Sequence, residues 1–79
     1  MRVLFFAQLK DVTGCAETTL ELDHRPDAAG LWRELAACYP ELAKFRSSVR
    51  LACNGEYVGP EARFADTDEV ALIPPVSGG

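Results

Sequence analysis

The end of the sequence holds the residues best suited to chemistry. After Ile73 the chain reads, in order, Pro74, Pro75, Val76, Ser77, Gly78 and Gly79. Prolines cannot donate ladder hydrogen bonds and favour an extended conformation, and six extended residues reach at most about 20 Å. Because glycine has no Cβ, Gly78 and Gly79 can enter a channel too narrow for other residues. Such a tail can place its final carboxylate beside the reactive centre of another protein.

The chemistry that suits this tail is carboxyl activation. A carboxylate is a poor electrophile because its leaving group would be oxide, whereas a mixed anhydride with AMP reacts with sulfur or nitrogen nucleophiles. The sequence has neither a glycine-rich phosphate-binding loop nor a Walker-type lysine motif. We therefore expect a partner enzyme to supply the ATP site. The chain itself is expected to be a substrate and carrier that is not catalytic alone.

The other candidate ligands and nucleophiles are too scattered to form a site. Cys15, Cys38 and Cys53 are widely spaced, a poor pattern for disulfides, zinc or iron–sulfur clusters. We expect them to be small packing residues in a reducing compartment. His24 has no obvious partner and is expected to be solvated. Three acids lack the spacing of a calcium loop and are expected to form a solvated turn: Asp66, Asp68 and Glu69. The sequence thus predicts no metal site.

Length and charge limit the classes of function. The 79 residues fit one domain, and 48% hydrophobic with 25% charged residues is ordinary for a globular protein. A net charge of −4 argues against nucleic acid as a partner, because phosphate contacts need a basic surface. No apolar run approaches the ~18 residues that span a membrane, and the apolar N-terminus is too short for a signal peptide. We therefore expect a cytoplasmic location and no membrane contact.

Five segments are predicted to be strands: residues 2–9, 17–22, 49–53, 56–58 and 70–73. The first and last are apolar on both faces, which is typical of central strands covered on each side. Residues 10–14 are predicted to form a turn. Residues 17–22 alternate, with Thr18, Leu20 and Leu22 on one face. Asn54 and Gly55 predict a tight hairpin because both tolerate positive φ. Val49, Leu51 and Cys53 are expected to face inward.

One amphipathic helix is predicted between these strands. Asp27 is the expected N-cap, since its carboxylate can accept from backbone N–H groups of the first turn. Pro40 disfavours helical geometry at the preceding residue and is expected to end the helix near Tyr39. An apolar stripe recurs at steps of three and four, formed by Ala28, Leu31, Leu35, Cys38 and Leu42. Three further residues widen it, Trp32, Ala36 and Tyr39, and we expect Trp32 and Tyr39 to lie in the core or at its edge.

The order ββαβββ predicts an α+β fold. With one helix available, that helix must cover one face of a mixed sheet of four to five strands. The first and last strands are expected to pair in parallel at its centre, which is the ubiquitin-like β-grasp arrangement. Residues 1–73 would form this single domain, and residues 74–79 an extended tail.

The chain resembles a known family at several motifs. The segments VLFFA (3–7), LACN (51–54) and DEVALIPPVSGG (68–79) resemble the small subunit of molybdopterin synthase, the MoaD-like sulfur carriers. The resemblance covers nearly the whole chain and is generic only in residues 28–48. Thr67 departs from the family, which usually has glycine there. Because a β-branched residue is costly at positive φ, we expect a different turn type at this position.

The resemblance implies a sulfur-donating subunit of a molybdopterin synthase (a sulfurtransferase) in molybdenum cofactor biosynthesis. An E1-like (MoeB-like) adenylyltransferase would use ATP to adenylate Gly79, and a persulfide donor would supply sulfur for a thiocarboxylate. The tail would then enter the large (MoaE-like) subunit, where the sulfur passes to cyclic pyranopterin monophosphate to form the dithiolene. By the same resemblance Gly78 and Gly79 carry the chemistry, and no cofactor is permanently bound. Four residues would guide the tail: Pro74, Pro75, Val76 and Ser77.

Three alternatives share parts of this pattern. A ubiquitin-like modifier would use the same activation to join Gly79 to lysines on other proteins. A sulfur carrier for another pathway, such as thiazole or cysteine synthesis, would also end in Gly-Gly. A plain β-grasp interaction domain would keep its function after deletion of Gly78 and Gly79.

Overall fold

The computed structural model describes residues 1–21 and 25–74. The elements follow one another as β1 (Arg2–Phe5), α1 (Gln8–Thr13), β2 (Glu17–Thr19), α2 (Ala28–Cys38), the 3₁₀ helix η1 (Pro40–Phe45), β3 (Arg50–Cys53), β4 (Glu56–Val58) and β5 (Glu69–Ile73). Within these residues no helix has the length and apolar character needed to cross a membrane.

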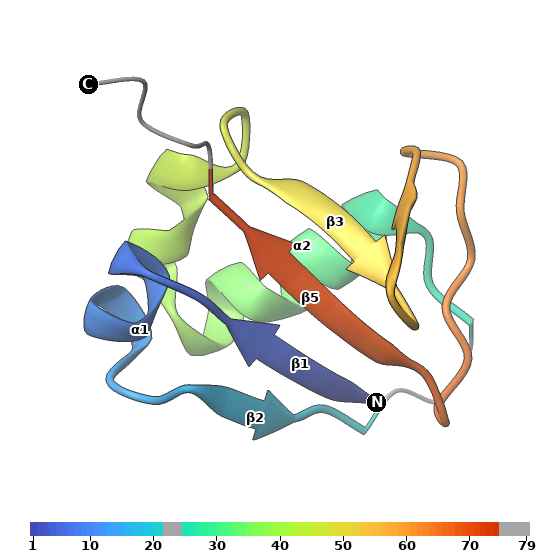
Figure 1. The fold of residues 1–79 in the computed structure, drawn as a ribbon, viewed down its shortest axis with the longest axis horizontal. Coiled ribbons are helices and arrows are strands. Elements are labelled where there is room, and N and C mark those ends of the chain that lie inside the picture. The colour runs from blue at the N-terminus through green and yellow to red at the C-terminus, as the bar shows by residue number, and fades with distance from the viewer. Residues whose placement is uncertain (22–24, 75–79) are drawn as a thin grey trace.

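The five strands form one mixed sheet in the order β2-β1-β5-β3-β4. β1 and β5 pair in parallel at its centre, with Val3 opposite Val70, and β3 joins β5 in antiparallel register, with Leu51 opposite Leu72. Parallel strands cannot be joined by a tight turn, and α2 crosses one face of the sheet between them (Figure 1). The α+β β-grasp fold and its central parallel pair, both predicted from the sequence, are confirmed.

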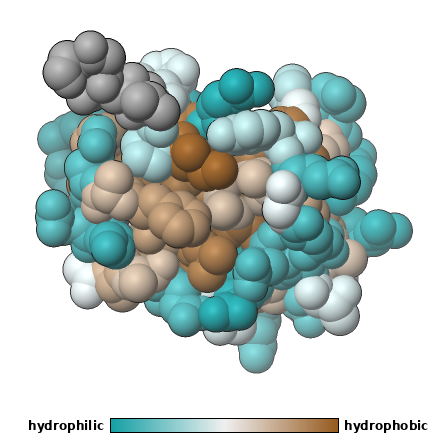
Figure 2. All heavy atoms as spheres, viewed as in Figure 1, coloured by the Kyte–Doolittle hydropathy of each residue, from teal (hydrophilic) through white to brown (hydrophobic). Residues whose placement is uncertain are grey.

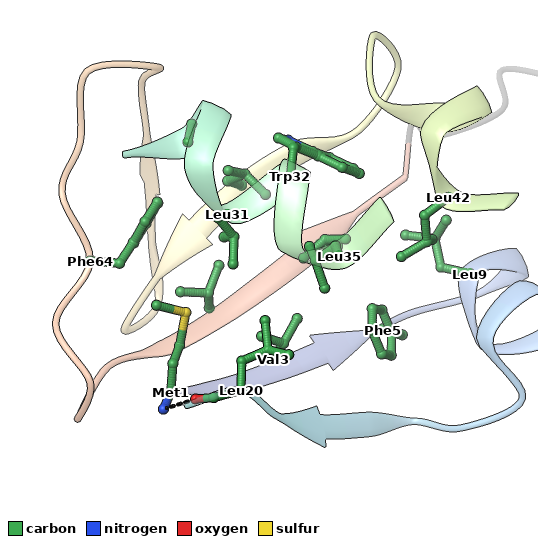
Figure 3. Close-up of a cluster of buried hydrophobic side chains, with 14 residues drawn as sticks. Met1, Val3, Phe5, Leu9, Leu20, Leu31, Trp32, Leu35, Leu42 and Phe64 are labelled. Carbon is green, nitrogen blue, oxygen red and sulfur yellow. Dashed lines mark hydrogen bonds between the residues drawn. The ribbon is translucent and has the colours of Figure 1, made fainter. Parts of the chain in front are cut away.

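The core lies between α2 and the sheet (Figure 3). The sheet contributes alternate residues of β1, β5 and β3, and α2 contributes its buried stripe. α1 and η1 close one end of the core with Leu9 and Leu42, and Phe64 closes the other, each of them fully buried. The remaining large buried side chains are Met1, Val3, Phe5, Leu20, Leu31, Trp32, Leu35, Leu51, Val70 and Leu72. One apolar layer therefore holds the sheet and α2 together.

The start of α2 is as predicted, and its end differs in detail. The Asp27 carboxylate accepts a hydrogen bond from the Gly30 N–H at 2.9 Å, which confirms the N-cap. The helix ends at Cys38, just before Pro40. Cys38 is exposed, so its predicted place in the apolar stripe is wrong. Leu42 is buried, but as part of η1, because Pro40 restarts the chain as a separate 3₁₀ helix.

The predicted first strand, residues 2–9, is too long. β1 ends at Phe5, and Ala7 turns the chain at φ 51° and ψ −129°. α1 then occupies most of residues 10–14, which were predicted to be a turn. Leu9 is fully buried and Val12 packs against the core, so their spacing of three is that of a helix face. The apolar residues that follow β1 therefore belong to a helix, α1, which packs Leu9 and Val12 against the core.

The remaining turns and strands follow the sequence pattern closely. Asn54 has φ 52° and Gly55 has φ 89°, as the predicted hairpin between β3 and β4 requires. β2 covers only Glu17–Thr19, with Thr18 half-buried, while Leu20 just beyond it is buried. Leu22 and His24 lie outside the described residues. Thr67 is not among the positions with positive φ, so this turn does avoid the conformation that glycine would allow.

Candidate functional site

The predicted tail begins at the end of β5, the central strand of the sheet. β5 is hydrogen-bonded on both sides, by β1 and by β3, and its last residue Ile73 pairs with Arg50. Pro74 follows directly and is half-buried. The other predicted tail residues lie outside the described residues: Pro75, Val76, Ser77, Gly78 and Gly79. Pro74, the first residue of the predicted tail, therefore follows directly from the centre of the sheet.

The face of the sheet opposite α2 carries an open apolar surface. Side chains from β1, β3, β4 and β5 surround a shallow depression of about 310 Å³. We call its apolar residues the apolar strip: Leu4, Phe6, Ala52, Tyr57, Ala71 and Ile73. Figure 2 shows this strip at the centre of a largely hydrophilic face. Phe6 is 45% exposed and Tyr57 58% exposed, and they are the two large hydrophobic residues most open to solvent among those described.

This surface corrects one expectation drawn from the sequence. The apolar character of β1 and β5 on both faces was typical of strands covered on each side, although the one helix was expected to cover a single face. In the structure α2 covers only one face, and the described residues place nothing over the other. Exposed apolar patches rimmed by polar residues mark protein interaction sites. The second apolar face is therefore a candidate docking surface that adjoins the base of the tail.

A group of ion pairs lies at the end of the strip where β1 and β5 begin. The Arg2 guanidinium donates to Glu17 and, at 2.8 Å, to Glu69. The hydrogen bond and charge of Arg2 lower the pKa of the Glu17 carboxyl, and the same contacts raise the pKa of Arg2. The three side chains carry one positive and two negative charges. This end of the face is therefore acidic.

The opposite end of the strip carries a cation. The Cζ atom of Arg50 lies 4.4 Å from the centroid of the Tyr57 ring. Tyr57 pairs with Ala52 across the hairpin, and Ala52 is two residues from Arg50, so the two side chains share one face. Arg50 pairs with Ile73 in turn. The charged end of this stack therefore lies beside the start of the tail.

The three acids before and at the start of β5 have separate structural partners. Asp66 accepts from the α-amino group of Met1 at 3.2 Å, and Glu69 binds Arg2. The Asp68 carboxylate accepts from the Ala65 N–H at 2.7 Å and from the Asn54 side chain at 3.1 Å. These bonds, the Ala65 N–H first, lower the pKa of Asp68. Asp66 lies in a solvent-exposed turn, as expected, and the three acids also tie the loop before β5 to its surroundings.

The other residues considered from the sequence have structural surroundings. Trp32 is buried, and the half-buried Tyr39 ring meets Phe5 edge to face at 5.6 Å, as expected for core and core-edge positions. The three cysteines are free thiols. Burial, with the nearby Asp68 charge, raises the pKa of Cys53, which disfavours its reactive thiolate. Within residues 1–21 and 25–74 no three His, Cys, Asp or Glu side chains gather where a metal ion could bind.

Comparison with known proteins identifies the family of the chain. The sequence profile described as the ThiS family matches residues 3–79, almost the full length of the chain. The chain belongs to the ThiS family. A relative of this ThiS-family chain from Chlamydomonas reinhardtii, named molybdopterin synthase sulfur carrier subunit, is 40% identical over 81 residues. That alignment covers 100% of this chain and 98% of the relative.

Two solved structures show the same fold as this ThiS-family chain. SAMP1 from Haloferax volcanii superposes with a TM-score of 0.86 at 28% identity, covering 100% of this chain and 98% of SAMP1. A complex of subunits 1 and 2 of the molybdopterin-converting factor from Helicobacter pylori contains a chain with a TM-score of 0.69 at 23% identity. The match covers 99% of this chain and 96% of that one. The second likeness concerns the fold alone.

In this ThiS-family chain the tail was predicted from the sequence and stays a prediction beyond Pro74, whereas the candidate docking surface was not foreseen. The signal was present in Phe6 and Ile73. Each adjoins an apolar neighbour, Phe5 or Leu72, and successive residues of a strand face opposite sides, so both members of such a pair cannot face one core.

The contact between Arg50 and the Tyr57 ring could not be predicted from the sequence, because it depends on the register in which β3 and β4 pair. Among the described side chains the Cys53 thiol lies near the Asp68 carboxylate, but its raised pKa disfavours the reactive thiolate. The described residues also present an exposed apolar surface that includes Ile73, the last residue of β5.

Proposed function

We propose that this chain is the sulfur carrier subunit of a molybdopterin synthase. The single observation that carries the proposal is the 40% identity, over the full length, to a relative of that name. The chain also ends in Gly78 and Gly79, five and six residues after the last residue of β5. The carrier presents its terminal carboxylate, and its partners supply the catalytic groups.

The proposed reaction begins with activation of the Gly79 carboxylate. An oxygen of this carboxylate attacks the α-phosphorus of ATP on an E1-like adenylyltransferase, which releases pyrophosphate and leaves an acyl adenylate. A persulfide of a donor protein displaces AMP, and reduction of the resulting acyl disulfide by a thiol leaves the thiocarboxylate. Catalysis of these steps requires an ATP site, and the chain has no phosphate-binding motif of its own.

The loaded carrier then docks on the large subunit of the synthase. In the proposal the apolar strip supplies the contact surface, and the tail leads Gly79 into the active site of the large subunit. There the sulfur passes to cyclic pyranopterin monophosphate. The net charge of −4 suits a partner whose active site must be basic to bind the pterin phosphate. Pro74 to Ser77 guide the tail, and Gly78 and Gly79 fit where a Cβ would not.

Reconstitution with purified components tests the proposal. Thiocarboxylated carrier, the large subunit from the same organism and cyclic pyranopterin monophosphate should together yield the dithiolene product. The matched control is the same chain with one residue added after Gly79, which should fold equally well and yield no product. Product formation by the extended chain, without removal of the added residue, would contradict the proposed role of the tail.

A second candidate function is a ubiquitin-like protein modifier. The observation in its favour is the structural match, over the full chain, to SAMP1, a small archaeal modifier protein. The two functions share activation of Gly79 and differ in the acceptor. Isopeptide bonds between Gly79 and lysines of other proteins, found by mass spectrometry of cell extracts, would support the modifier. Their absence, together with dithiolene formation in vitro, would support the sulfur carrier.

A further inference from the structure

The apolar strip has charges of opposite sign at its two ends. One end, where β1 and β5 begin, holds Arg2, Glu17 and Glu69. The charges of these three side chains add up to one net negative charge. Arg50 lies at the other end, in register with Ile73 and therefore beside the start of the tail. The docking face thus has a direction, from an acidic end to a basic end.

The two arginines on this face differ in how their N–H groups are used. The Arg2 guanidinium donates to two carboxylates. Within residues 1–21 and 25–74, Arg50 has no carboxylate partner, and its guanidinium lies over the Tyr57 ring. Stacking on an aromatic face holds the guanidinium plane and leaves its N–H edge free to bind a planar anion. Arg50 is therefore preorganised to accept a carboxylate from outside the chain.

Docking of a carrier on its partner needs an orientation as well as affinity. Burial of the apolar strip supplies affinity, but the hydrophobic effect has no direction. Charge pairs at the rim of an interface fix its register and reject wrong arrangements. A tail that must enter a channel works in only one orientation. A cation at the tail end of the strip supplies the missing direction.

We propose that Arg50 is a specificity-determining residue for docking: stacked on Tyr57, it binds a carboxylate of the large synthase subunit beside the entrance for the tail. The inference rests on the proposed function and adds the chemistry of the partner surface. That surface is an apolar patch with an acidic side chain at its tail-receiving end. A bidentate contact between guanidinium and carboxylate is the geometry that arginine favours over lysine.

Titration of the large subunit from the same organism with carrier variants tests this contact. Arg50→Glu should raise the dissociation constant by about tenfold or more, because it places a second carboxylate beside that of the large subunit. Arg50→Gln should raise the dissociation constant by about threefold, which is the effect expected from loss of an exposed ion pair. Arg33→Glu is the matched control, since exposed Arg33 lies on α2, on the far side of the sheet. It should change the constant by less than about twofold.

A charge exchange makes the test specific. Each exposed carboxylate near the active-site entrance of the large subunit is replaced in turn by arginine. One of these variants should bind the Arg50→Glu carrier better than the unmodified large subunit does. Urea denaturation should show that each carrier variant still unfolds in one cooperative transition, with a midpoint lowered by no more than the loss of an exposed contact with the Tyr57 ring.

Three results would overturn the inference. Arg50→Glu could bind the large subunit as tightly as the parent chain, or Arg33→Glu could weaken binding equally, which would indicate an effect of net charge alone. If Arg50→Glu weakened binding to the adenylyltransferase and left binding to the large subunit unchanged, the carboxylate that Arg50 contacts would belong to the adenylyltransferase. In each case dithiolene formation by the parent chain keeps the proposed function intact. A parent chain that never acquires a thiocarboxylate would instead refute the function itself.

Discussion

Phe5 and Phe6 are neighbours in the sequence but serve opposite faces of the sheet. Phe5 is 1% exposed and meets the Tyr39 ring in the core, whereas Phe6 is 45% exposed in the apolar strip. The alternation of side chains along a strand produces this separation. Phe5 therefore contributes to the stability of the core, and Phe6 is available to contact a partner protein.

Substitution of the two phenylalanines should separate these roles. Phe5→Ala is expected to lower the free energy of unfolding by about 3–5 kcal/mol, the cost of a large core truncation. Phe6→Ala should lower it by less than about 1 kcal/mol but weaken binding to the large subunit by about tenfold or more. Urea denaturation and a binding titration measure the two effects. A Phe6→Ala chain that keeps full affinity would show that the apolar strip is not the docking surface.

Loss of the helix cap should give a moderate and specific loss of stability. Asp27→Ala removes the acceptor for the Gly30 N–H and is expected to cost about 1 kcal/mol. Asp27→Ser keeps an acceptor at the same position and serves as the control, with a loss well below that of alanine. Thermal unfolding followed by circular dichroism compares the two. Equal losses in both variants would mean that the cap hydrogen bond contributes nothing.

The carboxylate of Asp68 should make the stability of the fold depend on pH on the acid side. Its pKa is lowered in the folded state, so its contribution is present above the ordinary aspartate pKa of about 4 and is lost as pH falls through the lower, folded value. Asp68→Asn cannot accept from both Ala65 and Asn54 and should lower stability near neutral pH by about 1 kcal/mol.

Urea denaturation at pH 7 and pH 3 tests this assignment of Asp68. The difference in stability between the two pH values should be smaller in Asp68→Asn than in the parent chain. Asp11→Asn, on α1, provides a control for the general effect of removing one negative charge. If Asp68→Asn and the parent chain lose equal stability between pH 7 and pH 3, the lowered pKa does not contribute to folding.

The turn after Phe6 should be improved by glycine. Ala7 has φ 51° and ψ −129°, a region costly for residues with a Cβ, by about 1–3 kcal/mol. Ala7→Gly relieves this strain but adds about 0.5–1 kcal/mol of unfolded-state entropy, so we expect a net gain of up to about 2 kcal/mol. Ala7→Val should destabilise the fold. A lower urea midpoint for Ala7→Gly would show that the turn is unstrained.

The parts of the fold that depend on local pattern could be predicted from the sequence. The Asp27 cap, the Asn54–Gly55 hairpin and the stop at Pro40 each depend on the backbone preference of one or two residues. The parallel pairing of β1 and β5 followed from their continuous apolar character. α1 was missed because the positive φ of Ala7 depends on tertiary packing of Leu9, and alanine itself does not predict such a turn.

The site could be predicted only in part, for a different physical reason. The tail is a feature of residue type and order, so Gly78 and Gly79 were identifiable directly. The docking surface depends on which of two apolar faces receives α2, and the sequence pattern is the same for both. The contact of Arg50 with Tyr57 further requires the register that places Tyr57 opposite Ala52. Cross-strand relationships of this kind depend on tertiary pairing.

The most direct test of the account is the intact mass of the chain after co-expression with its own adenylyltransferase and sulfur donor. A sulfur carrier should yield a species in which one oxygen is replaced by sulfur, and fragmentation should place the change on Gly79. A chain with one residue added after Gly79 should remain unchanged under the same conditions. If only the carboxylate form is found while the activating enzyme, ATP and sulfur donor are all active, the chain is not a sulfur carrier.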